Sequence, residues 1–131
     1  MPWHNLALGV AGFIGAVVAI IHGVIVQRLR VEPLSQRAVA NPPFSPVVRR
    51  LISPLLHFST VVWFAGGIAL IFATSLDSQA RLCIGLLVGG TYLFGAVGNF
   101  WATRGQHPGR MLMVLALVLI TFGAILPSRL T

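Results

Sequence analysis

Four long apolar runs constrain this chain more than any other feature of its sequence. They cover residues about 5–27, 54–73, 82–103 and 111–127. A helix of roughly 20 residues rises about 1.5 Å per residue and so crosses a hydrocarbon core about 30 Å thick. Within lipid every backbone polar group needs a partner in the chain, and a helix supplies one. The runs therefore predict an all-α fold, a four-helix transmembrane bundle that forms a single domain over residues 1–131.

The composition excludes a soluble domain of this size. Hydrophobic residues make up 56% of the chain, charged residues make up 8%, and the mean hydropathy is +0.91. A soluble fold cannot hide so much apolar surface, so lipid has to be the solvent. The single cysteine, Cys83, leaves no internal disulfide and no cysteine-based metal motif.

The arginines predict the orientation in the membrane. All nine basic residues are arginine, and the first and third loops hold seven of them. Arg81 and Arg129 are the two that fall on the other side. The positive-inside rule then places both termini outside and loops 28–52 and 104–110 in the cytoplasm, as in a multi-pass protein of the bacterial inner membrane.

The net charge of +7 would suggest nucleic acid in a soluble protein. Here the arginines lie between apolar runs, so the predicted partner is the anionic headgroups of the bilayer and not nucleic acid. The predicted lipid-binding residues are Arg28, Arg30, Arg49, Arg50 and Arg104.

The second apolar run has a clear predicted start. Ser53 is a good helix cap, and Pro54 suits the first turn, where its missing N–H removes no helical hydrogen bond. The preceding segment 28–52 contains several prolines, which favour extended backbone. We therefore expect the helix to begin at Pro54 and the basic segment to be a cytoplasmic loop.

Small residues recur at helical spacing and predict close helix contacts. In the third run Gly85 and Gly89 are four residues apart. The first run carries a longer stripe made of Gly9, Gly12, Ala16, Ala19 and Gly23. Such faces let two helix backbones approach closely, either within the chain or between copies in a homo-oligomer.

Three polar side chains lie inside the apolar runs at similar predicted depth. His22 precedes Arg28 by six residues, and His57 follows Arg50 by seven. Asn99 likewise comes five residues before the next arginine in the chain. A polar group in lipid needs a partner, so all three are expected to face the interior of the fold.

Two interpretations of these polar residues remain open. They form either a structural polar layer or a ligand site. Two histidines on facing antiparallel helices are typical of axial haem ligation or of half a metal site. On that interpretation His57 and His22 are the ligands of haem b or copper, and Asn99 supports them.

The stretch His57-x5-Trp63-Phe-Ala-Gly66-Gly67 resembles a short motif of known membrane proteins. Small four-helix proteins of the copper-resistance D (CopD-like) type carry His, Trp and Gly at similar spacing. Membrane protoporphyrinogen oxidases of the HemJ type have a comparable stretch in their first helix and bind haem through a histidine. The resemblance implies a haem or copper role for His57, which is therefore expected to matter more than His22.

Three functional classes follow from these observations. The first is a small inner-membrane protein with an intramembrane histidine site that handles haem or copper. The second is a non-catalytic accessory subunit of a larger membrane complex that binds anionic lipid. The third is a small solute transporter, which is indicated by little beyond the number of helices.

Overall fold

A computed structural model describes residues 3–33, 36, 45–103 and 109–125 of the chain. Four α-helices account for most of these residues, and the first and last each continue into a short π-helical segment. In chain order the elements are α1 (Trp3–Val26), η1 (Gln27–Val31), α3 (Pro46–Ala73), α4 (Ser78–Thr103), α5 (Gly109–Ile120) and η2 (Thr121–Ile125). The prediction of an all-α fold is confirmed for this part of the chain.

Three of the described helices are long and apolar enough to cross a membrane. The candidate spans are Trp3–Leu29, Ser53–Ala73 and Ser78–Gly98. The fourth apolar helix, Met111–Ile125, is shorter. At about 1.5 Å per residue it does not reach the full thickness of a bilayer core of about 30 Å. The helices are those of a membrane protein, as the apolar runs predict.

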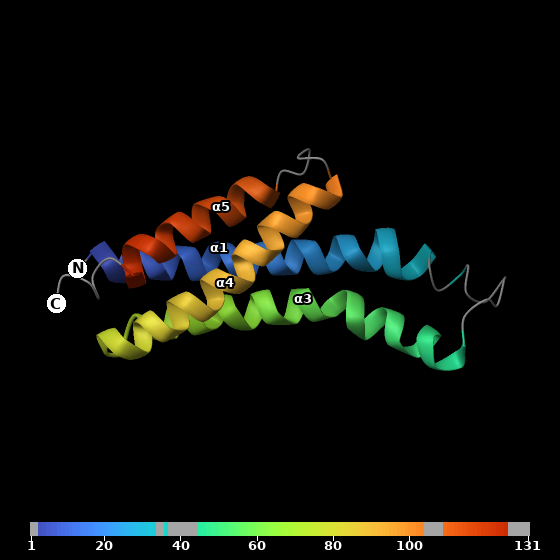
Figure 1. Cartoon of the computed structure of the whole chain (residues 1–131), viewed down its shortest axis with the longest axis horizontal. Coiled ribbons are helices and arrows are strands. Elements are labelled where there is room, and N and C mark those ends of the chain that lie inside the picture. Colours follow the sequence, from blue (N-terminus) through green and yellow to red (C-terminus); the bar gives the residue numbers. More distant parts are fainter. Residues whose placement is uncertain (1–2, 34–35, 37–44, 104–108, 126–131) are drawn as a thin grey trace.

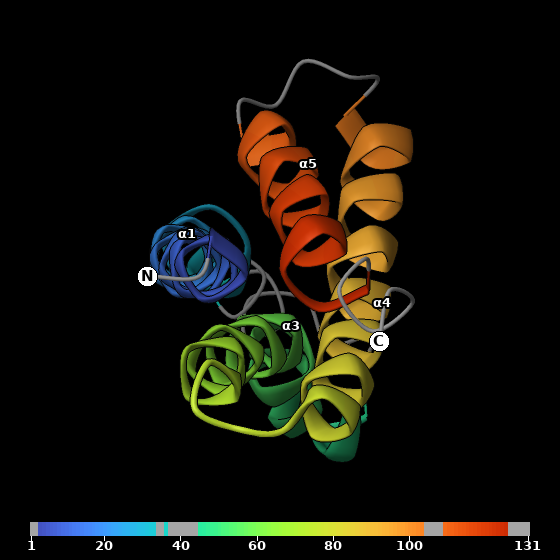
Figure 2. The same ribbon diagram turned by 90° about the vertical axis from the view of Figure 1, so that its left-hand side faces the viewer.

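The four helices pack as antiparallel neighbours. α1 contacts α3 and α5, and α4 contacts the same two helices (Figure 2). The start of α1, the α3–α4 turn and the end of η2 lie at one end of the molecule, here named the turn end (Figure 1). A hydrogen bond from His4 Nδ1 to the backbone oxygen of Phe122, at 3.4 Å, joins the first and last of these elements.

The opposite end, where α1 passes into η1 and α3 begins, is here named the basic end. There α1 and α3 extend beyond α4 and α5 (Figure 1). With 28 residues, α3 is about 42 Å long at 1.5 Å per residue, which exceeds a hydrocarbon core of about 30 Å. The first turns of α3 therefore project past the membrane span.

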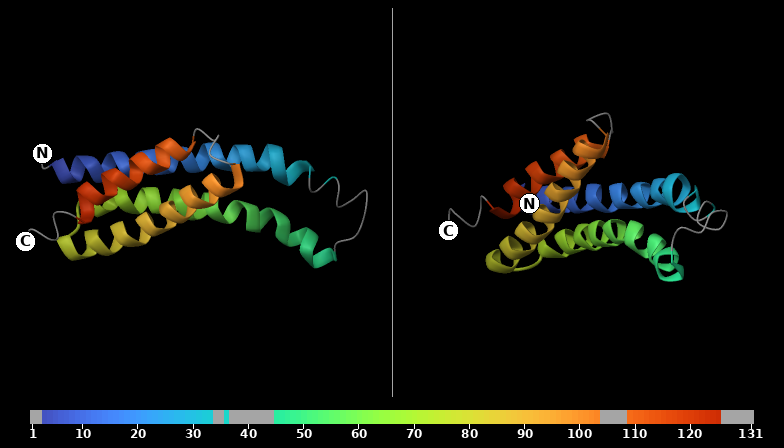
Figure 3. Two further views of the ribbon diagram at one scale, coloured as in Figure 1. Left: turned by 45° about the horizontal axis from the view of Figure 1, so that its top comes forward. Right: turned by 45° about the vertical axis from the view of Figure 1, so that its right-hand side comes forward.

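α3 begins at Pro46, so the expected start at Pro54 is wrong. Pro46 occupies the first turn, where a proline removes no helical hydrogen bond. Pro54 lies inside the helix, where its ring crowds the carbonyl of the residue four positions earlier and bends the helix without ending it. Figure 3 shows the blue-green start of α3 curving away from the rest. Segment 28–52, expected as a loop, is thus helical at both ends, while 34–35 and 37–44 lie outside the described residues.

Glycines bring α1 and α3 into contact at the level of the backbone. A Cβ on Gly12 would lie 2.5 Å from the carbonyl oxygen of Gly67, and a Cβ on Gly67 would lie 2.6 Å from the carbonyl oxygen of Gly12. On the other side of the fold, a Cβ on Gly85 would meet the Cβ of Ala124 at 2.5 Å. The small-residue stripes predicted close helix contacts either within the chain or between copies in a homo-oligomer. Close packing within the chain is confirmed at these positions.

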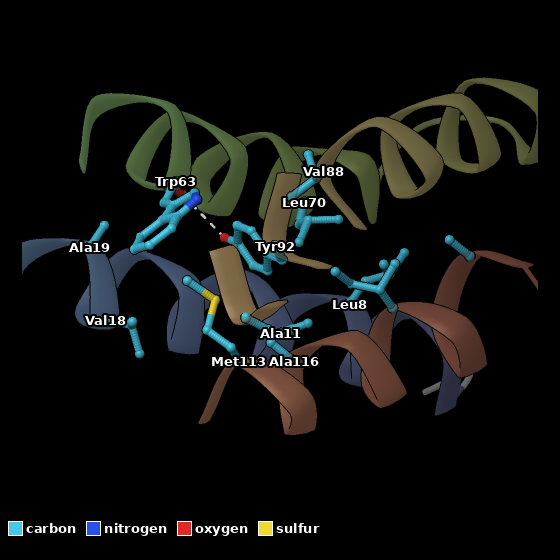
Figure 4. Packing of buried hydrophobic residues seen from close by; sticks show 13 residues of the cluster. Leu8, Ala11, Val18, Ala19, Trp63, Leu70, Val88, Tyr92, Met113 and Ala116 are labelled. Carbon is cyan, nitrogen blue, oxygen red and sulfur yellow. Dashed lines mark hydrogen bonds between the residues drawn. The ribbon is translucent and has the colours of Figure 1, made fainter. Parts of the chain in front are cut away.

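Tyr92 of α4 links three helices in the core. The side chain is fully buried, and its hydroxyl donates a hydrogen bond of 3.1 Å to the backbone oxygen of Trp63 in α3 (Figure 4). The same hydroxyl occupies the space that a Cβ on Gly15 of α1 would fill. The phenol therefore fits only because α1 carries a glycine at this point.

Asp77 and Arg81 stabilise the α3–α4 turn through hydrogen bonds to its backbone. Oδ1 of Asp77 accepts hydrogen bonds of 2.9 Å from the backbone N–H groups of both Gln79 and Ala80 and so caps α4. Nη2 of Arg81 donates to the backbone oxygens of Thr74 and Leu76, at 3.3 and 3.1 Å, where α3 ends. The bond from Ala80, with help from the Arg81 charge, lowers the pKa of Asp77 below its usual value of 3.8.

Candidate functional site

A groove of about 600 Å³ lies between α3 and α4 and is here named the α3–α4 groove. Its volume falls within the usual range for small-molecule sites, about 300–1,000 Å³. Most of its wall is apolar, with aromatic rings from both helices and a few polar groups. The side chains that matter below are His22, Phe58, Ser59, Trp63, Thr91 and Phe94.

Two features of the helices form the groove. α3 and α4 diverge from their shared turn, and α4 carries glycines, which have no side chain, at this level. Figures 1 and 3 show the two helices separating away from the turn end. Gly90 and Gly98 line the groove, and no atom lies within 4 Å of the place where either would carry a Cβ. Gly95 between them is instead covered by the ring of Trp63. The two uncovered glycines thus leave open space in the wall.

His22 reaches this groove from a third helix, α1. Its Nε2 lies 3.4 Å from the hydroxyl oxygen of Ser59, and its ring lies 4.8 Å from the Trp63 ring at an interplanar angle of 54°. The imidazole is half-buried, and Trp63 is only 6% exposed. An ionisable ring in the wall of an apolar groove within a membrane span is a functional-site candidate by default.

His57 lies nearer the basic end and does not line the groove. Its Nε2 is 2.9 Å from Oε1 of Gln27, across the α1–α3 contact. An amide oxygen only accepts hydrogen bonds, so Nε2 of His57 carries the proton in this arrangement. Each histidine therefore bonds to a residue of the opposite helix, and the two take different partners.

The structure thus divides the expected polar layer into two pairs, Gln27–His57 and, deeper in the span, His22–Ser59. Asn99 lies in α4, and its side chain lies outside the described part of the structure. The structure does not show the three polar residues meeting at one point.

A haem between the two histidines would not fit this helix packing. At the level of the His22–Ser59 pair, a Cβ on Gly23 of α1 would lie 2.8 Å from Cγ2 of Thr60 in α3. α1 and α3 are therefore in contact at this level, with no slot for a flat macrocycle. The α3–α4 groove does offer such space, and His22 is the histidine that lines it. Among the described residues that line the groove, the only histidine is His22, and His57 is paired with Gln27 outside it.

A copper site would need several soft or imidazole donors around one point. Among the residues that the structure describes, no three His, Cys, Asp or Glu side chains gather in this way. Cys83 is exposed, and the two histidine pairs are separate. The described donors suit a ligand held by one histidine better than they suit copper.

Two of the five predicted lipid-binding arginines have described side chains. Arg28 in η1 and Arg50 in α3 are both exposed at the basic end. The side chains of Arg30 and Arg49, and the whole of Arg104, lie outside the described residues.

The motif around Trp63 has a packing role that is visible in the structure. Trp63 packs on Gly95 and His22, and Gly67 packs on the α1 backbone. Gly66 faces Val88, whose Cγ1 would lie 3.0 Å from an added Cβ. Helix contacts alone therefore account for the tryptophan and the two glycines.

Sequence reasoning missed the pairing of Tyr92 with Trp63 and Gly15. The one available signal was a tyrosine inside an apolar run, since a buried hydroxyl needs a hydrogen-bond partner.

No family model matches the chain, and neither a curated protein nor a solved structure matches it. The resemblance of the His57–Gly67 stretch to the copper-resistance D and HemJ types stays a hypothesis.

Proposed function

We propose that the protein is a multi-pass protein of the bacterial cytoplasmic membrane that binds a flat, lipid-soluble ligand in the α3–α4 groove through His22. One observation carries the proposal: an imidazole from α1 forms part of the wall of an apolar groove of about 600 Å³ between two other helices. An ionisable ring inside a membrane span is a functional-site candidate by default, and a groove of this volume suits a small ligand.

The proposed orientation is a four-helix bundle with both termini outside and the basic end in the cytoplasm. The start of α1 and the end of η2 lie at the turn end, opposite Arg28 and Arg50 (Figure 1). The seven-to-two division of the arginines supports this assignment under the positive-inside rule.

Haem b is the first ligand to test. The aromatic rings of Phe58 and Phe94 offer flat apolar surfaces, and a histidine is a common axial ligand of haem iron. The His22–Ser59 hydrogen bond is long at 3.4 Å, so breaking this one bond would cost little. Haem bound there would supply a redox-active iron, and His22 and the groove would hold and orient it. This geometry favours His22 over His57 as the ligand, which reverses the ranking suggested by the motif.

The experiment is an absorption spectrum of the purified protein with added haem. His22→Ala should abolish the Soret band of bound haem, while His57→Ala should leave it in place. A second pair of variants separates ligand binding from folding. Gly90→Leu should block the groove, and Gly9→Leu is its control, because both glycines have open space around them and only Gly90 lines the groove.

Haem binding that survives both His22→Ala and Gly90→Leu would overturn the site. If no flat ligand binds at all, the His22–Ser59 pair is structural. In that case the protein is better described as a non-catalytic accessory subunit of a larger membrane complex.

A further inference from the structure

The second histidine pair lies at headgroup depth. The candidate span in α1 ends at Leu29, and the span in α3 begins at Ser53. Gln27 is therefore in the last turn of one span, and His57 is about one turn inside the other. Arg28 and Arg50 lie at or just outside the same boundary, where the phosphates of a bilayer leaflet are found.

Helix periodicity brings Arg50 to the same side of α3 as His57. The two positions are seven residues apart, which is close to two full turns of an α-helix. That side of α3 meets η1, since His57 bonds to Gln27 and Val31 of η1 is only 5% exposed. Arg28 directly follows Gln27 in η1, so one exposed arginine lies near the Gln27–His57 pair along each of the two helices.

Few carboxylate side chains lie near Arg28 and Arg50 to balance their positive charge. The chain contains two carboxylate side chains, Glu32 and Asp77, and Asp77 lies at the opposite end. Glu32 is exposed just after η1, and no ion pair joins it to Arg28 or Arg50 among the described side chains. A guanidinium binds phosphate oxygens through two parallel N–H donors, which makes phosphate the fitting anion.

The geometry points to a phospholipid site at this place: the phosphate of an anionic lipid of the cytoplasmic leaflet binds Arg28 and Arg50 beside the Gln27–His57 pair. The sequence predicts five lipid-binding arginines, Arg28, Arg30, Arg49, Arg50 and Arg104, without placing them relative to one another. Of these arginines the structure describes the side chains of Arg28 and Arg50, which lie on two elements joined by the His57–Gln27 hydrogen bond. This site is separate from the α3–α4 groove, because His57 does not line that groove.

The test measures the thermal stabilisation of the detergent-solubilised protein by added lipid. Phosphatidylglycerol should raise the melting temperature more than phosphatidylcholine, and high salt should reduce the difference. A basic residue near an anionic surface adds about fivefold in affinity. The double variant Arg28→Gln/Arg50→Gln should therefore need on the order of 25-fold more phosphatidylglycerol for the same shift.

Two controls make the result specific. Glu32→Gln alters the charge at the same end by one unit and should preserve or strengthen the effect of phosphatidylglycerol. Gly90→Leu blocks the groove and should leave it unchanged, so failure of the ligand proposal and failure of the lipid site are distinguishable.

Three outcomes would overturn the inference. The first is a double variant that keeps the full response to phosphatidylglycerol. The second is an equal response to phosphatidylcholine. The third is an equal response to glycerol phosphate without acyl chains, which would show a site for free phosphate instead of a lipid.

Discussion

The hydroxyl of Tyr92 in α4 donates a hydrogen bond of 3.1 Å to the backbone oxygen of Trp63 in α3. This bond lies at the point where α1, α3 and α4 meet, over Gly15 of α1. It also holds α3 and α4 together beside the groove, because the Trp63 ring forms part of the groove wall. Packing of the core and the shape of the candidate site are thus connected through one tyrosine.

Removing the hydroxyl should have a modest effect. Tyr92→Phe is expected to lower the free energy of unfolding by about 1 kcal/mol, the net contribution of a typical intramolecular hydrogen bond. Gly15→Ala should destabilise more, since its methyl group would overlap the phenol. In the Tyr92→Phe background the same alanine should cost less, because the nearest clashing atom is gone. Denaturant unfolding of the four proteins in detergent measures this coupling, and strictly additive effects would contradict the arrangement.

The contact between α1 and α3 predicts a sharp difference between two glycines. Gly12→Ala should destabilise the protein by about 1–3 kcal/mol, because the added methyl group meets the backbone oxygen of Gly67. Gly98→Ala should be neutral or slightly stabilising, since nothing lies within 4 Å of its Cβ position and alanine is the better helix former. Thermal unfolding of the two variants side by side checks this. Equal effects would mean that the two helices are not in backbone contact.

The proposed orientation predicts opposite labelling at the two ends of the molecule. In a Cys83→Ser background, a cysteine at Ser78 should react with a membrane-impermeant maleimide in spheroplasts. A cysteine at Gln36 should react only after the membrane is opened. Both positions are exposed, so burial does not explain a difference between them. Labelling of both from the outside would contradict the assignment.

Acid should loosen the α3–α4 turn through Asp77. The pKa of this carboxyl is lowered in the folded protein, chiefly by the hydrogen bond from the backbone of Ala80. Its contribution to stability is therefore fully present above the usual pKa of 3.8 and is lost as the pH falls through the lower folded-state value. Asp77→Asn keeps a capping side chain and should remove this part of the pH dependence. Unfolding curves of both proteins at decreasing pH measure the difference.

The sequence by itself determined the helical class and the approximate position of each helix along the chain. Apolar runs of this length have one stable form in lipid, because only a helix satisfies its own backbone there. Spacing along a helix also sets depth, so the distances from His22 and His57 to the arginines placed both rings toward one end. Gly12 and Gly23 of the α1 stripe likewise marked the face that α3 covers, whereas nothing in the described structure lies close to Gly9. All of these are local properties of a segment.

Only the tertiary structure decided which side chains meet. Tyr92 and Trp63 are 29 positions apart, and His57 and Gln27 are 30 positions apart. Such pairs depend on the register and divergence of whole helices, and a shift of one residue turns a side chain by about 100°. Pro54 shows the same limit, because a proline that is able to begin a helix can also lie within one when an earlier proline begins it. His22 lines the groove and His57 pairs with Gln27. This separation of the two histidines therefore arises from how α1 and α3 pack and from the angle at which α4 leaves them.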